Sequence, residues 1–315
     1  MVAPLSSDRS RTIRAQAPLN RGNDRPQVMD TAPLLIGLTS LLAATVNGAL
    51  GYGYSSITVP IALLMVSNRI LNPSLVIVEV AVNLYALYLA RHSARRVWPH
   101  VAPIAVGILP GVIAGSVVLA SISSDWAKLI TYATLLPLIL VQAAGLSWPI
   151  RRTRVVGAPF GIGVGLLYSL TTISGPPLAL YFNNQRMAKD DFKVALALTR
   201  TIESTATLVA YTWLGVLTRD SASLVPYLAP GVILGLPFGF FLIRKLDAET
   251  FRRICMSFDA WLVGFGLARV VSRLELVPTV WAFQLLTLTA LIDAVLLKMF
   301  FSRRMAILRA GARSR

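Results

Sequence analysis

The amino-acid sequence predicts an all-α polytopic membrane protein, and both its composition and its apolar runs support this fold class. Hydrophobic residues make up 55% of the 315 positions and charged residues 14%, against about 25% charged residues in ordinary soluble domains. The mean hydropathy is +0.66. Apolar runs recur at about 17 to 25 residues, the length that crosses roughly 30 Å of hydrocarbon. Burial in a bilayer is therefore expected in place of one large aqueous core.

The apolar runs divide the chain into nine segments joined by short polar loops. Residues 1–32 come before them, and their polar composition, with five arginines and three prolines, predicts a disordered basic tail. Met29 is a candidate alternative start of translation that would remove this tail. Residues 301–315 form a second basic tail, which is predicted to be cytoplasmic. The segments cover residues 33–66, 74–90, 100–120, 127–147, 157–182, 194–217, 225–243, 254–271 and 278–300.

Basic residues give the chain a net charge of +16, and most of them gather in the loops. This pattern is typical of the positive-inside rule, and no aromatic-interleaved basic stripe points to nucleic acid. We therefore expect the lipid bilayer, and no nucleic acid, as the partner of these charges. The single cysteine, Cys255, excludes an intrachain disulfide and a cysteine-cluster metal site. Four clusters are predicted to be cytoplasmic: Arg91, Arg95 and Arg96; Arg151, Arg152 and Arg154; Arg244, Lys245, Arg252 and Arg253; and Arg303, Arg304 and Arg309.

These basic clusters conflict with a simple alternation of crossings. Three segments separate the second cluster from the third, so single crossings would place the two clusters on opposite sides. The conflict disappears if segment 157–182 enters and leaves on the same side, as a hairpin broken at residues 174–177. The two prolines there remove backbone donors, and such backbone occurs at membrane depth only beside protein or a wet cavity. A hairpin in 33–66 would place the N-terminal arginines outside, so either translation starts at Met29 or that segment spans fully.

An internal repeat supports the same picture. At an offset of 124, Glu79 matches Glu203 and three glycines match three others. We predict two inverted repeats, 33–147 and 157–271, each a broken or re-entrant segment plus three transmembrane helices, with an extra transmembrane helix at 278–300. Such repeats surround one midplane site in many secondary transporters. At an offset of 117, the residues Gly48, Pro60, Leu63 and Arg69 fall on Gly165, Pro177, Leu180 and Arg186.

The matching glycines also have a plain packing explanation. Small residues four positions apart let transmembrane helices approach closely. The repeat and the packing explanation are compatible, because the same glycines can serve both. The glycines at the offset of 124 are Gly107, Gly111 and Gly115, matched by Gly231, Gly235 and Gly239.

Four ionisable residues sit well inside the apolar runs: Glu79, Arg200, Glu203 and Asp293. Each costs about 2.5 to 3.5 kcal/mol at a helix centre, so each needs a partner or a wet cavity. Arg200 and Glu203 are three residues apart on one predicted helix and can pair directly. Burial disfavours a charged carboxylate, so Glu79 and Glu203 are candidates for proton coupling. An ion pair that fixes helix register is the alternative, and Asp293 is interpreted as a local helix-packing group.

The two broken segments carry the candidate substrate site. Half-helix N-termini bind anions through free N–H groups and a partial positive charge; kinked packing without a ligand is the alternative. Neither glycine-rich stretch ends in the Gly-Lys-Ser/Thr of a phosphate loop. No catalytic triad or pair of catalytic carboxylates occurs, so we expect neither an enzyme nor a cofactor. The predicted substrate contacts are Gly48, Gly51, Gly53, Ser55, Ser56, Ser174, Gly175, Pro176 and Arg200.

Four motifs in residues 33–271 point to a known family. The glycine-rich first segment ends in Val59-Pro60, Asn72-Pro73 follows, Gly175–Pro177 leads into residues 178–182, and Gly235–Arg253 precedes the eighth segment. Together they resemble the sulfite exporter TauE/SafE family. The resemblance implies a multi-pass permease of the plasma membrane, the bacterial inner membrane in bacteria, for sulfite, sulfonates or other small organic anions. The ninth segment and basic tail exceed the family's usual pattern, and assembly into a homo-oligomer is one expectation for them.

The expected function is that of a secondary transporter. It would move a small anion such as sulfite, a sulfonate or an organic carboxylate by alternating access, with Arg200 supplying charge and Glu79 or Glu203 coupling protons. Two alternatives stay open. A channel-like facilitator would conduct the anion without regard to a pH gradient. A membrane assembly or scaffold protein would account for the extra helix and tail, but not for two matching broken segments.

Overall fold

The computed structural model describes residues 32–89, 91–144, 153–183, 185, 187–243, 245 and 247–313. The predicted N-terminal tail, apart from Ala32, and the alternative start at Met29 lie outside these ranges. So do Arg151, Arg152 and Arg244 of the basic clusters. Helices dominate the described ranges, which contain no strand, so the all-α prediction is confirmed there. The helices are α1 (Ala32–Leu50), α2 (Tyr54–Ala62), α3 (Asn68–Leu89), α4 (Arg91–Ser121), α5 (Ser124–Ala143), α6 (Thr153–Thr171), α7 (Gly175–Asn183), α8 (Lys189–Trp213), α9 (Arg219–Leu242), α10 (Ala248–Arg273) and α11 (Thr279–Arg313).

Both segments that were predicted to be broken consist of a long helix, a three-residue break and a short helix. Residues 51–53 separate α1 from α2, and residues 172–174 separate α6 from α7. The second break lies earlier than predicted. Pro176 and Pro177 belong to the first turn of α7, where the missing N–H of a proline has no intrahelical partner to lose. The prolines therefore begin the short helix and do not interrupt it.

Six of the described helices are long and apolar enough to cross a membrane. These spans are Asn68–Tyr88, Ser93–Ser121, Ser124–Val141, Arg219–Leu242, Glu249–Arg273 and Thr279–Ser302. The loop predicted before residue 100 is wrong, because α4 already begins at Arg91. Helix α11 continues through the predicted basic C-terminal tail to Arg313. Arginine is a good helix former, so a membrane helix can extend past its apolar part through basic residues.

The helix order repeats once along the chain, from α1–α5 to α6–α10. The bounds of α6 and α7 (153, 171, 175 and 183) each lie 121 residues after those of α1 and α2 (32, 50, 54 and 62). The offset of 117 inferred for these segments is therefore wrong by four residues, about one helical turn. A slip of one turn keeps residues on the same helix face, so glycine and proline matches alone do not resolve it. The inversion of one half relative to the other stays a prediction.

Packing partners are exchanged between the two halves. Helix α1 packs along α9, and α6 packs along α4. Glycines form these crossings: a Cβ atom on Gly107 would lie 1.9 Å from the Ala158 carbonyl oxygen, and one on Gly239 would lie 2.0 Å from that of Thr45. The close helix approach expected of the glycine pattern is thereby confirmed.

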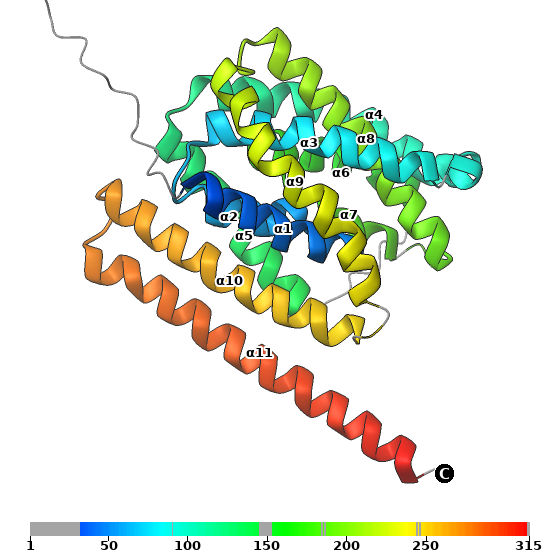
Figure 1. The fold of residues 1–315 in the computed structure, drawn as a ribbon. Coiled ribbons are helices and arrows are strands. Elements are labelled where there is room, and N and C mark those ends of the chain that lie inside the picture. Colours follow the sequence, from blue (N-terminus) through cyan, green and yellow to red (C-terminus); the bar gives the residue numbers. More distant parts are fainter. Residues whose placement is uncertain are drawn as a thin grey trace, which may run out of the picture.

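Helix α11 lies at the outer edge of the bundle, beside α10 (Figure 1). A buried ion pair joins the two helices, with 2.8 Å between Arg253 Nη2 and Asp293 Oδ1. The Ser257 hydroxyl lies 3.2 Å from the same carboxylate oxygen. Asp293 is thus a helix-packing group, as predicted, but Arg253 is not part of an open cytoplasmic cluster. Only 3% of its side chain is exposed, because α10 begins five residues earlier than Arg253 and carries it inside.

Candidate functional site

The two breaks meet at the centre of the bundle. A Cβ atom on Gly175, the first residue of α7, would lie 3.1 Å from Cβ of Tyr52 in the first break. Tyr52 packs in the apolar cluster of α4, α6, α7 and α8, whereas Ile173 of the second break packs in the cluster that includes α1, α2, α5 and α10. Each break therefore places a side chain in an apolar cluster that includes helices of the other half.

Glycine and threonine make the two turns in different ways. Gly51 and Gly53 have φ angles of 82° and 110°, and Thr172 has a φ of 58°. Glycine adopts positive φ freely, whereas a β-branched residue is strained there. Such strain is concentrated at functional sites and switch regions, so the second break is a candidate for both.

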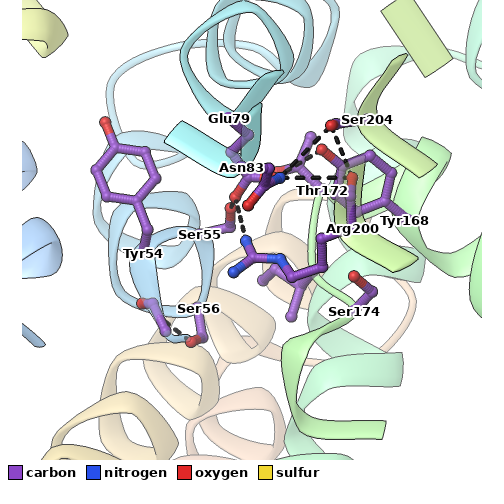
Figure 2. Close-up of polar contacts among 12 residues, drawn as sticks. Tyr54, Ser55, Ser56, Glu79, Asn83, Tyr168, Thr172, Ser174, Arg200 and Ser204 are labelled. Carbon is purple, nitrogen blue, oxygen red and sulfur yellow. Dashed lines mark hydrogen bonds and ion pairs between the residues drawn. The ribbon is translucent and has the colours of Figure 1, made fainter. Parts of the chain in front are cut away.

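Glu79 on α3 is the centre of a buried polar cluster (Figure 2). Its Oε1 accepts hydrogen bonds from the Ser55 hydroxyl of α2 and, at 3.0 Å, from Arg200 Nη2 of α8. Its Oε2 accepts a hydrogen bond of 2.6 Å from the Tyr168 hydroxyl of α6. Three helices from both halves therefore converge on one carboxylate, and its charge is satisfied.

Arg200 pairs with Glu79 across the halves and not, as expected from the sequence, with Glu203 on its own helix. The spacing of three residues permits that pair, but the Glu203 side chain is engaged elsewhere, by the Ser174 hydroxyl of the second break. Arg200 is 5% exposed, and its Nε has no hydrogen-bond partner among the described residues. One donor of the guanidinium is therefore left for another ligand.

Glu203 is fully buried and less well satisfied than Glu79. Its Oε2 accepts the hydrogen bond from Ser174, whereas its Oε1 has no partner in the described part of the chain. The Thr207 hydroxyl, one turn further along α8, is also buried and without a partner there. The second half therefore repeats a contact between a serine at the break and a glutamate, with Ser174 inside the second break and Ser55 two residues beyond the first. No cation joins the second contact in the described part of the chain.

Two smaller polar contacts hold α3 against α8 beside this cluster. Asn83 Nδ2 lies 3.4 Å from both the Arg200 carbonyl oxygen and the Ser204 hydroxyl. Ser204 in turn donates a hydrogen bond of 2.7 Å to the Arg200 carbonyl. These contacts fix the face of α8 that carries Arg200.

A small cavity lies between the breaks and α10. It is lined by Gly53 and Ser56 from the first half, by Pro176 of α7, and by Asp259 of α10 together with apolar neighbours. Its volume of about 20 Å³ is enough for roughly one water molecule. Ser55 and Ser56 thus face different sites, the glutamate cluster and the cavity.

The remaining predicted contacts lie apart. Gly48 sits inside α1, where a Cβ atom would lie 2.2 Å from the Leu236 carbonyl oxygen of α9, so its contacts are those of a helix crossing. Gly51 is exposed, and no atom lies within 4 Å of the place that a Cβ atom would occupy on it. The structure brings Ser55, Glu79, Ser174, Arg200 and Glu203 together, and it places Gly53, Ser56 and Pro176 on the cavity.

Sequence reasoning missed Tyr168 and Asp259. Asp259 lies inside the apolar segment 254–271, so the search for ionisable residues in apolar runs could have found it. Tyr168 gives no such signal, because tyrosines are common in membrane helices. Only the fold shows that its hydroxyl reaches Glu79 from a distant segment.

The fold and the site define a polytopic helical membrane protein in which broken helices meet beside buried charges, an arrangement typical of secondary transporters. The family described as "Sulfite exporter TauE/SafE" matches residues 36–265. The chain belongs to this family, and it is a multi-pass protein of the bacterial inner membrane.

One curated relative is the "Probable sulfite/organosulfonate exporter TauE" of Cupriavidus necator. It is 30% identical over 188 residues, which cover 56% of this chain and 70% of the relative. No solved structure gives a significant match.

Proposed function

We propose that this protein is a secondary transporter that exports sulfite or an organosulfonate by alternating access. The observation that carries the proposal is the meeting of two broken helices, one from each half, beside a buried charge cluster that joins the halves. The family and the name of the C. necator relative support the class of substrate. The shared helix order of the two halves supports the alternating-access mechanism.

The anion would bind between the starts of α2 and α7. Both short helices begin at the breaks, so their partial positive charges are directed there. The first turn of α2 also offers free N–H groups, whereas in the first turn of α7 Pro176 and Pro177 have none and Gly175 supplies the N–H. Arg200 supplies the nearby positive charge, and its unpaired Nε is the group available to a sulfonate or sulfite oxygen. Glu79 neutralises part of this charge, which would keep the site from holding an anion too tightly to release it.

Proton coupling is assigned to Glu203 in preference to Glu79. Both oxygens of Glu79 are already engaged, because they accept hydrogen bonds from three side chains, one of them the Arg200 guanidinium. Glu203 has one serine donor and a buried oxygen without a partner among the described residues. A buried carboxylate in such surroundings favours the protonated form, so it can take up and release a proton as its surroundings change.

Flux measurements in proteoliposomes test the proposal. We expect the purified protein to move sulfite and a small sulfonate, and to do so faster when a proton gradient is imposed. Glu203→Gln should keep the fold and lose the response to the gradient, whereas Arg200→Ala should lose flux. Unchanged transport in both variants would remove these residues from the mechanism.

The two alternatives predict different results in the same assay. A channel-like facilitator would give flux that ignores the proton gradient in the wild-type protein. A scaffold protein would give no flux and no anion-dependent rise in thermal stability. Either result would overturn the proposed mechanism.

A further inference from the structure

Asp259 is a further buried carboxyl group between the halves, and the charge cluster of Glu79 and Arg200 does not involve it. It lies on α10, is 6% exposed, and lines the cavity beside Gly53, Ser56 and Pro176. Its Oδ1 is buried and has no hydrogen-bond partner in the described part of the chain. Its neighbours along the chain give no structural reason for an acidic residue at this position.

No cation balances this carboxyl group among the described residues that line the cavity. The other titratable side chains there are Cys255, one turn earlier on α10, and Tyr52 of the first break. Helices α1, α2, α5 and α7 contribute Val46, Leu50, Ile57, Ile139 and Pro176, and α10 adds Met256, none of which titrates. An unpaired buried charge is costly, so Asp259 differs from Glu79 and from Asp293, which both have an arginine.

We propose that Asp259 is a protonation site that gates anion binding between the two breaks. This inference rests on the proposed transport function and names a further coupling residue for it. The proton comes from water and adds to the Asp259 carboxylate, and no other bond forms or breaks. The neutral carboxyl group can then donate a hydrogen bond to an anion seated at the starts of α2 and α7.

Electrostatics give the direction of the coupling. A charged Asp259 repels an anion in the same low-dielectric cavity, whereas the protonated group removes the repulsion and adds a donor. Anion and proton therefore favour each other's binding, and this coupling is reciprocal. The cavity of about 20 Å³ has room for roughly one water molecule, so binding also requires α2, α7 or α10 to move apart.

The test is the pH dependence of anion binding to the purified protein, with methanesulfonate as the probe. A sulfonate stays ionised through the neutral range, so any pH dependence belongs to the protein. We expect the wild-type affinity to fall as the pH rises, by up to about tenfold for each pH unit if one proton is linked. Asp259→Asn should bind with one affinity across the range, close to the wild-type affinity at acidic pH.

Two control variants separate Asp259 from other carboxyl groups. Glu249→Gln removes an exposed carboxylate from the same helix and should leave the pH dependence unchanged. Asp220→Asn removes an exposed carboxylate from α9 and should also leave it unchanged. The inference is overturned if Asp259→Asn retains the wild-type pH dependence; a loss of that dependence in Glu203→Gln alone would assign the protonation site to Glu203.

Proton uptake is a second measurement, and it is made on the wild-type protein, so it requires no variant. Addition of methanesulfonate to wild-type protein in weak buffer should withdraw up to about one proton per bound anion, and the absence of uptake would contradict the gate. Asp259→Ser is the replacement if the Asn variant does not fold. If Asp259→Asn instead loses only 2-aminoethanesulfonate binding, the group recognises an ammonium and not a proton. A wild-type protein that neither binds nor moves any anion would overturn the proposed function itself.

Discussion

The two breaks have the same architecture and different chemistry. Each joins a long helix to a nine-residue helix. A serine at the start of the first short helix, and a serine inside the second break, each donate a hydrogen bond to a buried glutamate. The first break turns through two glycines and its glutamate has an arginine; the second turns through Thr172 and its glutamate has no cation partner in the described chain. The repeat therefore fixes geometry, whereas charge and strain differ between the halves.

This difference indicates that the two halves could have different roles in a transport cycle. The first break is unstrained and both oxygens of its glutamate are engaged, features that suit a part of the site that stays in place. The second break combines a residue at positive φ with a carboxylate oxygen that has no partner among the residues that the structure describes, and both features favour a second conformation. The predictions below test this asymmetry, beginning with the charges.

Removing the positive charge of Arg200 should change the free energy of unfolding most. Arg200→Gln leaves the Glu79 charge buried without its counter-ion and should destabilise the protein by about 3–5 kcal/mol. Glu203→Gln should cost much less, because no arginine of the described residues pairs with that carboxylate. Unfolding of purified variants in mixed detergent measures both changes.

A double variant sharpens this comparison. Glu79→Gln combined with Arg200→Gln removes both charges and should recover much of the loss caused by Arg200→Gln alone. If the double variant is as unstable as the sum of its parts, the two residues are not coupled. Equal losses for Glu79→Gln and Glu203→Gln would remove the proposed asymmetry of charge.

Substitutions at the helix crossings should destabilise the protein equally in the two halves, whereas substitutions of the charged residues should not. Alanine at Gly107 or at Gly239 puts a Cβ atom 1.9 or 2.0 Å from a carbonyl oxygen of the crossing helix. Each change should cost about 1–3 kcal/mol, because a close-packed crossing has no space to relax. Gly163→Ala is the matched control, since nothing lies within 4 Å of its Cβ position. A loss at only one crossing would show that the halves also differ in packing.

The sequence was sufficient for what depends on local pattern. Apolar length predicted the six helices that are long and apolar enough to cross a membrane, although α8, predicted as a transmembrane helix over 194–217, is not one of them. The glycine spacing predicted the close helix crossings. The buried glutamates and Arg200 could be found because charges in apolar runs are costly. The partner of Arg200 could not be predicted, because α8 and α3 each offer a glutamate and only the fold determines which of them faces Arg200.

The register of the repeat shows the same limit. Matches of glycine and proline gave an offset of 117, whereas the helix bounds give 121. A four-residue slip preserves the helix face, so similar residues recur after one turn. Tyr168 was missed for a related reason, since its importance lies in a contact between segments that are distant in sequence. Asp259 carries the same signal as the buried glutamates, a charge inside an apolar run, but its place on the cavity is set by the fold.

Substitutions that alter the backbone freedom of the breaks should change the free energy of unfolding least. The size of the change should differ between the two halves. Gly51→Ala forces an alanine to a φ of 82° with no neighbour within 4 Å, so backbone strain alone should destabilise the protein by about 1–2 kcal/mol.

Thr172→Gly relieves strain at a φ of 58° but loses the hydroxyl hydrogen bond to the Thr171 carbonyl. It also adds freedom to the unfolded chain, so its net change should stay within about 1 kcal/mol. Detergent unfolding of the two variants side by side measures the difference. A loss at Thr172→Gly as large as that at Gly51→Ala would mean that the threonine side chain holds the second break in place. The second break would then be as rigid as the first, and a conformational change would have to be sought in the long helices instead.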